Sequence, residues 1–490
     1  MPDLSPVSAS SAAVGSGFVG QGESGRRVGG AAAHGPPGRP ADVVIPAAAA
    51  GRTKQSPEPS APRICLDHLA STPCDPEAAA LVQRLAVEAW ANPSSPHRAG
   101  RLAARHVERA REQVAAAIDA LPEEIVFTSG ATEANNLAIL GVAAAVEREA
   151  LGRAPGDGRR RLLTLGIEHP SVLAPIAELA RRGFDVEHVT LQPDGRVDLD
   201  ALADRLEGAL LLSIQAANNE IGTLQPLAEA SRMAAEHGVL VHGDAAQILG
   251  KLPFSVEELD LDFASLSAHK CYGPKGIGAL WIRGGARRAP IAPITFGGSH
   301  ESGLRPGTPN APAIAGFGLA VELASERMER DAKRLGVLRD RLEQELAARL
   351  GDRVRLNGAL GHRLPHATSL TFFDPDGRPL DADALVANLP EFDLSTASAC
   401  HAGTPEPSHV LRAIGMAREE AYATLRVGLG RGVERAEVDR AAERIVGSPP
   451  LRHSSSRHAK PRAGGDPAEL WRADHHHTRT ETQVLDGTHE

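Results

Sequence analysis

The chain lacks the long apolar runs of a membrane protein and is poor in aromatic residues. Aromatic side chains make up 3% of its 490 residues. Its longest apolar runs, such as residues 137–146, fall well short of the roughly 20 residues that a membrane-spanning helix needs. No short apolar run near Met1 carries the flanks of a signal peptide. We therefore expect a protein that neither crosses a membrane nor is secreted.

Cysteine is also scarce. The four residues, Cys65, Cys74, Cys271 and Cys400, form no CxxC pair and show no spacing typical of metal ligands. This pattern argues against a disulfide framework and against a zinc site. Because free thiols persist in a reducing compartment, we expect a cytoplasmic protein with no bound metal.

An excess of basic residues is missing as well. The chain has 53 Lys and Arg against 62 Asp and Glu, a formal net charge of −9, and no dense basic segment. A nucleic-acid partner is therefore not expected, since such binding depends on a positive surface. The apolar share of 42% and the charged share of 23% are those of a globular protein.

Two terminal segments differ in composition from the rest. Residues 1–62 are rich in Ala, Gly, Ser and Pro and show no helical or strand period, and residues 447–490 are rich in Pro, Ser, His and charged side chains. Such segments do not bury enough apolar area to offset the entropy lost on ordering. We predict disordered tails, and the histidines at 475–477 are better explained by a solvated polar tail than by a metal site.

Between the tails, short β-type runs alternate with amphipathic segments of helical length, which is typical of an α/β fold with a mainly parallel sheet. After Pro312 a long helix to about residue 350 is followed by a less regular alternation, which indicates a smaller α+β domain. Strands are predicted at 125–128, 162–167, 184–190, 210–215, 239–242, 263–267 and 277–282.

Open α/β sheets place ligands at the carboxyl ends of their strands, so polar groups that directly follow a strand are candidate site residues. Residues 129–133 (SGATE) combine a glycine turn with a helix start, which suits a phosphate, although Thr132 would also serve as a plain N-cap. His169 follows another strand, where a structural histidine is the alternative. Residues 218–220 (NNE) follow a third strand, where a turn with Asx hydrogen bonds is equally compatible.

Asp244, Gln247 and Lys270 follow the next two strands. An acid that emerges from an apolar strand is costly to bury unless a cation pairs with it, which favours a functional role for Asp244. Lys270 is one of only six lysines among the 53 basic residues. It is a candidate Schiff-base former, because burial lowers the pKa of a lysine and frees its amine. The glycines at 273–278 do not meet the pattern of a nucleotide P-loop.

A phosphate cradle, an aspartate, a histidine and a lysine on successive strand ends are typical of a pyridoxal phosphate site. Eight segments, in order along residues 64–446, closely resemble the cysteine desulfurases, class V aminotransferases among the fold-type I pyridoxal phosphate enzymes. The segments are SGATEANNLA (129–138), EHPSVL (168–173), NNEIG (218–222), GDAAQ (243–247), SAHKCYGPKGIGALW (267–281), RPGT (305–308), SACHAGTPEPSHVLRAIG (398–415) and LRVGLGR (425–431).

The resemblance implies a large domain with a mainly parallel seven-stranded sheet at residues 75–325. It also implies a smaller domain at residues 326–446, to which an N-terminal segment at residues 63–74 belongs. Pyridoxal 5′-phosphate is the implied cofactor, and a homodimer is the implied assembly.

Roles for individual residues are likewise implied by the resemblance. Lys270 would hold the cofactor, Asp244 would pair with its ring nitrogen, and His169 would stack on the ring and assist proton transfers. Asn219 and Gln247 would contact the ring hydroxyl. The residues that would bind its phosphate are Ala131, Thr132, Ser267 and His269, joined by Thr308 of the other subunit.

Three further residues would act on the substrate. Arg426 would clamp the substrate carboxylate, a task that suits its planar fork. Asn92 matches a family motif near the pocket, and Cys400 matches the sulfur-accepting cysteine. The implied reaction converts L-cysteine to L-alanine and leaves the sulfur on Cys400 as a persulfide. The sulfur would supply iron–sulfur cluster assembly or another transfer pathway through an acceptor protein that the sequence does not identify.

Selenocysteine lyase is a close alternative, because Cys400-His401 and residues 88–101 look at least as similar to that sister enzyme. It would convert L-selenocysteine to alanine and selenide. The family's usual Ser-Gly is replaced by Thr396-Ala397, which bears on the motion of the following loop. An aminotransferase and a non-catalytic scaffold of the same fold are the remaining alternatives.

Overall fold

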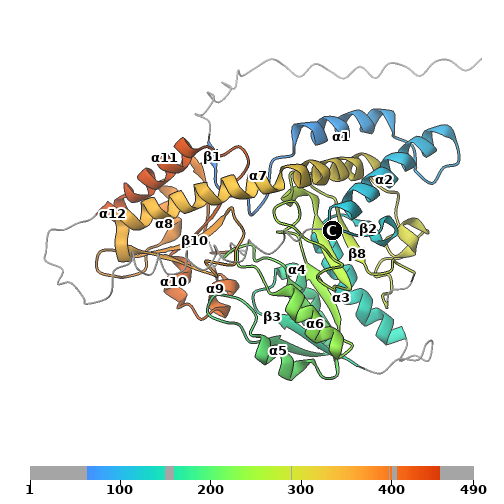
Figure 1. Cartoon of the computed structure of the whole chain (residues 1–490), viewed down its shortest axis with the longest axis horizontal. Helices are drawn as coiled ribbons and strands as arrows, with labels where there is room; N and C mark the ends of the chain where they lie inside the picture. Colours follow the sequence, from blue (N-terminus) through green and yellow to red (C-terminus); the bar gives the residue numbers. More distant parts are fainter. Residues whose placement is uncertain (1–62, 149–158, 288–289, 397, 400–405, 453–490) are drawn as a thin grey trace, which may run out of the picture. The chain divides into compact units, whose positions relative to one another are not determined.

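The computed structural model describes residues 63–148, 159–287, 290–396, 398–399 and 406–452 (Figure 1). Both predicted tails, apart from residues 447–452, and Cys400 lie outside the described residues. Within the described ranges, no helix combines the length and the apolarity of a transmembrane span.

A seven-stranded sheet forms the centre of the region that holds the predicted site residues. β8 is antiparallel to both of its neighbours, and the other pairs are parallel, which confirms the expected mainly parallel α/β architecture. All residues of β5 and β7 are buried, as apolar strands covered on both faces require. The order in the sheet is β2 (Ile125–Thr128), β8 (Gly278–Ile282), β7 (Phe263–Ser267), β6 (Leu240–Asp244), β5 (Ala209–Gln215), β3 (Arg161–Leu165) and β4 (Asp185–Val189).

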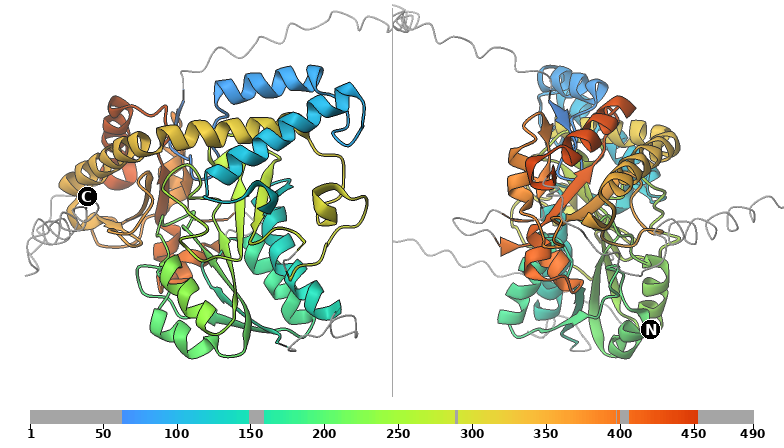
Figure 2. Two further views of the ribbon diagram at one scale, coloured as in Figure 1. Left: turned by 45° about the vertical axis from the view of Figure 1, so that its right-hand side comes forward. Right: turned by 90° about the vertical axis from the view of Figure 1, so that its left-hand side faces the viewer.

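Helices flank this sheet, and their ends follow local sequence signals. Asp75 caps α1 with Pro76 at the first helical position, and His169 caps α4 with Pro170 in the same place. α1 and α2 both pack against the long helix α7 (Figures 1 and 2). The helices are α1 (Pro76–Glu88), α2 (Arg98–Ala116), α3 (Ala131–Arg148), α4 (Pro170–Arg181), α5 (Leu199–Leu206), α6 (Leu227–Glu236) and α7 (Ala311–Leu350). Short 3-10 turns are η1 (Pro122–Glu124), η3 (Ala268–Lys270), η4 (His300–Gly303) and η5 (Gly351–Arg353).

A second, antiparallel sheet has the order β12 (Ser395–Thr396), β15 (Thr424–Gly428), β10 (Ala367–Phe372) and β9 (Val354–Leu356). The C-terminal part of α7 and α11 (Arg435–Val446) pack together beside it. The remaining pairs are β1 (Ile64–Cys65) with β11 (Phe392–Asp393) and β13 (Ser398–Ala399) with β14 (Glu406–Pro407). The remaining helices are α8 (Ala382–Ala387), α9 (His409–Ala413), α10 (Arg418–Tyr422) and α12 (Pro449–Arg452).

The domain boundaries at 74/75 and 325/326 stay predictions. α7 runs through the second boundary without a break. The described chain also continues as α12 beyond residue 447, where Leu451 is buried in the same apolar cluster as Leu425 and Val438.

A buried ion pair joins α7 to the segment before β10. Arg363 donates from Nη1 to Oε1 of Glu343 at 2.8 Å and from Nη2 to Oε2 at 2.7 Å. The side chains are only 6% and 1% exposed, respectively. Two charges removed from water in this way stabilise the fold only while both are present, because a single buried charge has no compensation.

We therefore expect Glu343→Gln to lower the free energy of unfolding by about 3–5 kcal/mol, since Arg363 then stays buried without a counter-charge. A urea titration followed by circular dichroism measures this loss. The matched control is Glu236→Gln, which removes an exposed partner of Arg232 on α6 and should change the free energy by about 0.5 kcal/mol or less. Equal effects of the two substitutions would contradict the expectation.

Candidate active site

The predicted cofactor residues converge on one cavity of about 540 Å³ at the carboxyl ends of the parallel strands. The cavity is also lined by Gln215, at the end of β5, and by Ser171, in the first turn of α4. The predicted residues that line it are Ala131, Thr132, His169, Asn219, Asp244, Gln247, Ser267, His269 and Lys270. The topology explains the convergence, because β3, β5, β6 and β7 are neighbours and each ends at the same edge of the sheet.

One end of the cavity is the start of α3. Gly130 precedes the helix with φ 152°, a conformation that residues with a side chain rarely adopt. Ala131 and Thr132 then begin an 18-residue helix whose first N–H groups have no partner within the helix. Backbone N–H groups at such a helix start attract an anion, so this end of the cavity suits a phosphate group.

Asp244 lies at the end of β6 and is 7% exposed. Its Oδ1 accepts a hydrogen bond from the backbone N–H of Ala246 at 3.0 Å, and its Oδ2 accepts one from Nδ2 of Asn135 at 2.8 Å. These neutral donors orient the carboxylate and leave its negative charge without a cationic hydrogen-bond partner among the described residues. A positively charged ligand atom would supply the missing counter-charge.

Lys270 lies in η3 directly after β7 and lines the cavity. Its Nζ donates to the carbonyl oxygens of Leu69 at 2.7 Å and Ala70 at 2.9 Å. Burial, reinforced by the charge of Arg426, lowers the pKa of this amine to about 8. A neutral, nucleophilic form of Lys270 is therefore accessible near neutral pH.

Two other lysines lie in the neighbourhood. Burial lowers the pKa of Lys251 to about 7, but this residue lines a separate cavity of about 20 Å³, and its Nζ donates to Oε1 of Gln247 at 3.3 Å. Lys275 lines the main cavity from the loop that follows η3. Lys270 alone of the three combines a strand-end position, a lowered pKa and a place in the wall of the main cavity.

Burial also favours the neutral form of two histidines that line the cavity, His169 and His269. Burial lowers the pKa of His169, and the charges of Lys270 and His409 add to this effect, whereas Asp244 opposes it. Burial likewise lowers the pKa of His269 to about 4, and its Nδ1 lies 3.1 Å from Oγ of Ser71.

Arg426 extends from β15 of the second sheet toward the same site. Its Nη1 donates to the carbonyl oxygen of Asn219 at 3.1 Å, and its Nη2 donates to Oδ1 of Asp67 at 2.8 Å. The buried Nε has no hydrogen-bond partner among the described residues. Each terminal nitrogen keeps a second hydrogen, so the guanidinium retains donors that suit a carboxylate ligand.

Asp67 is a site residue that the sequence analysis missed. Its Oδ2 accepts a hydrogen bond from Oγ of Ser395 at 2.7 Å, so both oxygens are engaged, one of them by Arg426. The available signal was an isolated acid within the apolar run at residues 64–69, the same feature that identified Asp244.

Three of the predicted residues that the structure describes, Asn92, Thr308 and Arg426, do not line the cavity. Asn92 lies in an exposed turn before α2, where its Oδ1 accepts from the N–H of Ser94 at 2.9 Å, and Thr308 is exposed in the segment before α7. Cys400 lies outside the described residues. Cys271 is completely buried, and burial raises the pKa of its thiol to about 12, which makes it a poor nucleophile.

The chain is similar to known proteins over most of its length. The aminotransferase class-V family model matches residues 64–441. The chain is 40% identical over 368 residues to "Cysteine desulfurase IscS" of Dictyoglomus turgidum, which covers 75% of this chain and 89% of the relative. It is 43% identical over 396 residues to "Cysteine desulfurase" of a Frankia species, which covers 78% and 90%.

Among solved structures, a "NifS-like protein" superimposes with a TM-score of 0.70 at 36% identity, over 78% of this chain and 98% of that one. The family resemblance of the eight segments is thereby confirmed. The chain belongs to the aminotransferase class-V family, whose cysteine desulfurase members are pyridoxal phosphate enzymes.

Proposed function

We propose that this protein is a pyridoxal phosphate-dependent cysteine desulfurase that converts L-cysteine to L-alanine and transfers the sulfur to Cys400. The observation that carries the proposal is the convergence of nine predicted cofactor residues on the cavity that contains the Lys270 amine. Curated relatives that are 40% and 43% identical bear the name cysteine desulfurase. The assignments of individual residues below belong to this proposal.

The residues of the cavity fit the cofactor at three points. The N–H groups at the start of α3 suit its phosphate, Asp244 supplies a negative charge for a protonated ring nitrogen, and Lys270 supplies an amine of lowered pKa for its aldehyde. When bound, the cofactor draws electrons away from the substrate Cα and so makes the Cα proton acidic.

The side chains of this protein then have separate tasks. Arg426, which Asn219 and Asp67 hold in place through one hydrogen of each terminal nitrogen, binds the substrate carboxylate with the remaining hydrogens of these nitrogens. This hold sets the Cα–H bond toward Lys270, whose neutral Nζ takes the proton.

Cys400 completes the reaction as a thiolate. Its Sγ attacks the substrate sulfur, so that a sulfur–sulfur bond forms as the bond between Cβ and sulfur breaks and its electron pair returns to the carbon side. A proton then completes the methyl group of alanine, and a persulfide remains on Cys400. An acceptor protein would take this sulfur for iron–sulfur cluster assembly or another pathway.

A reducing compartment is consistent with this chemistry, since a persulfide-forming thiol must stay reduced between turnovers. Cys65, Cys74 and Cys271 are free thiols in the structure. We accordingly assign the protein to the cytoplasm.

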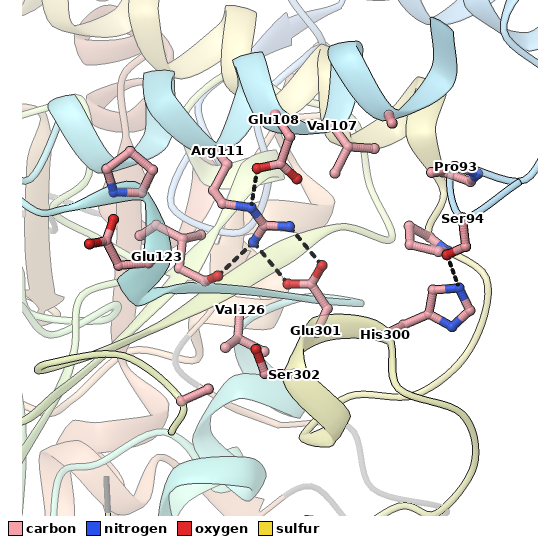
Figure 3. A pocket seen from close by; sticks show the side chains of 15 residues that line it. Pro93, Ser94, Val107, Glu108, Arg111, Glu123, Val126, His300, Glu301 and Ser302 are labelled. Atoms are coloured by element: carbon pink, nitrogen blue, oxygen red, sulfur yellow. Dashed lines mark hydrogen bonds and ion pairs between the residues drawn. The ribbon is translucent and has the colours of Figure 1, made fainter. Parts of the chain in front are cut away.

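We further propose that a second copy of the chain completes each phosphate site with Thr308. The exposed Thr308 does not reach the cavity of its own chain, yet its segment is firmly held. Arg111 on α2 donates to both carboxylate oxygens of Glu301, at 3.0 and 2.8 Å, beside a pocket of about 490 Å³ (Figure 3). Arg305 pairs with Glu133 of α3 at 2.8 Å.

The backbone supports the same conclusion. Glu301 and Ser302 have φ angles of 47° and 55°, a left-handed conformation that costs about 1–3 kcal/mol for each residue of this kind. The ion pair with Arg111 and the N–H of Phe127, which donates to Glu301 at 2.8 Å, offset this cost. A strained and well-anchored segment that presents an exposed threonine suits a partner subunit.

Lys270→Ala should abolish turnover and the visible absorbance of the cofactor's link to lysine, because no other amine has its position. Borohydride reduction of the wild-type holoenzyme followed by peptide mapping should place the label on Lys270. A label on Lys251 or Lys275 would show that the lysine is assigned wrongly. Lys275→Ala is the matched control and should keep the absorbance band.

Cys400→Ser should abolish alanine and sulfide production from L-cysteine, because the thiol of cysteine leaves only when a thiolate attacks it. Some selenide release from L-selenocysteine should persist, since a selenol ionises more readily and its bond to carbon is weaker. Sulfide, selenide, alanine and cyanide-labile sulfur are the quantities to measure.

Cys74→Ser, which changes a partly exposed thiol away from the cavity, is the control and should behave as wild type. Undiminished desulfuration by Cys400→Ser would overturn the role of Cys400. A wild type that turns over selenocysteine but is only inhibited by cysteine would identify a selenocysteine lyase instead.

Mixing Thr308→Val chains with Lys270→Ala chains tests the shared site. If Thr308 acts in trans, a heterodimer has one site with both defects and one with neither, so mixing should recover one active site in two. If Thr308 acted within its own chain, no intact site would form and activity would not exceed half that of the Thr308→Val homodimer. A fully active monomer by light scattering would also exclude the proposal.

A further inference from the structure

A chain of hydrogen bonds joins Asp244 to His169, and both residues line the cavity. Nδ2 of Asn135 donates to Oδ2 of Asp244 at 2.8 Å and to Oγ of Ser171 at 2.8 Å. Oγ of Ser171 lies 2.7 Å from Nδ1 of His169. Asn135 is completely buried and Ser171 is 8% exposed, so water does not compete for these bonds.

The direction of each bond follows from the available donors and acceptors. An ionised carboxylate only accepts, so the nitrogen of the Asn135 amide must face Asp244. The reversed amide would set an oxygen against the carboxylate, and the two would repel each other. The second hydrogen of Nδ2 goes to Oγ of Ser171, and the hydroxyl hydrogen is then left for His169.

Nδ1 of His169 therefore accepts twice. It accepts from the hydroxyl of Ser171 and from the backbone N–H of the same residue, at 3.1 Å. A hydrogen on Nδ1 would face both donors, so the single hydrogen of a neutral ring is on Nε2. The Nε2 atom has no hydrogen-bond partner among the described residues, and the ring lines the main cavity.

The charged groups around the ring favour its neutral form. Asp244 on β6 raises the pKa of His169, but burial outweighs it and lowers the pKa, and Lys270 on η3 and His409 on α9 act in the same direction as burial. Without the two donors to Nδ1, protonation of this nitrogen would be easier, because a lone pair engaged by hydrogen bonds is less available to a proton.

We propose that Asn135 and Ser171 are positioning residues that hold His169 as the Nε2–H tautomer, so that it meets a ligand in the cavity as a hydrogen-bond donor and not as a base. The proton at Cα is then left to Lys270 alone. The catalytic consequence rests on the proposed function, whereas the tautomer does not.

The tautomer can be measured directly by ¹⁵N NMR of the holoenzyme labelled at its histidine side chains. Loss of a signal in His169→Gln assigns the resonance. We expect an unprotonated shift for Nδ1 and a protonated shift for Nε2 across the neutral pH range. A protonated Nδ1 in the wild type would overturn the proposal, whether or not the variants fold.

Ser171→Ala and Ser171→Thr form a matched pair. The alanine variant removes one of the two donors to Nδ1, so the pKa of His169 should rise and the ring should become charged at higher pH. The acid limb of the kcat profile for alanine release should move to higher pH with it. Ser171→Thr keeps the hydroxyl and should restore both titrations.

An unchanged His169 titration in Ser171→Ala would contradict the role of Ser171. The proposed function and the tautomer of His169 are tested separately. A wild type that releases no alanine from cysteine would refute the proposed function. The NMR spectrum of the same protein would still show which nitrogen of His169 is protonated.

Discussion

The buried negative charge of Asp244 is the constraint on which the site depends. Removal of a carboxylate from water costs several kcal/mol unless hydrogen bonds and an opposite charge compensate for it. Ala246 and Asn135 supply two hydrogen bonds, but neither supplies a positive charge. In the proposed function, a ligand with a protonated nitrogen would complete the compensation, which would explain why an acid is tolerated at the end of a largely buried strand.

The order of the strands in the sheet places the other candidate site residues beside Asp244. β5, β6 and β7 are adjacent, so the segments that follow them bring Asn219, Asp244 and Lys270 to one edge although they are far apart in the sequence. β3 lies beside β5 and adds His169. Parallel strands are required for this arrangement, because antiparallel neighbours would end at opposite edges of the sheet.

The strands of the large sheet and most of the candidate cofactor residues could be predicted from the sequence, because strand ends and helix starts carry local signals. The predicted strands agree with the structure to within about two residues. The nine cofactor residues that the family resemblance implied lie at or shortly after strand ends and line the cavity. The sequence analysis did not predict the roles of Asp67, Asn135 and Ser171, because these roles depend on partners distant in the chain. Asp67 and Arg426 are 359 positions apart, and Asn135 and Asp244 are 109 apart. A polar residue in an apolar segment indicates that a partner exists, but only the fold identifies it.

The two buried lysines show why a lowered pKa alone does not identify the reactive amine. Burial lowers the pKa of both Lys251 and Lys270, but only Lys270 opens onto the main cavity. Lys251 instead contacts a residue of the cavity wall, because its Nζ donates to Oε1 of Gln247. Nε2 of Gln247 in turn donates to the carbonyl oxygen of Leu69 at 3.0 Å. With its oxygen engaged and one amide hydrogen used, Gln247 retains one amide hydrogen for a ligand. A cofactor hydroxyl at this position would therefore meet a donor, which favours its ionised form.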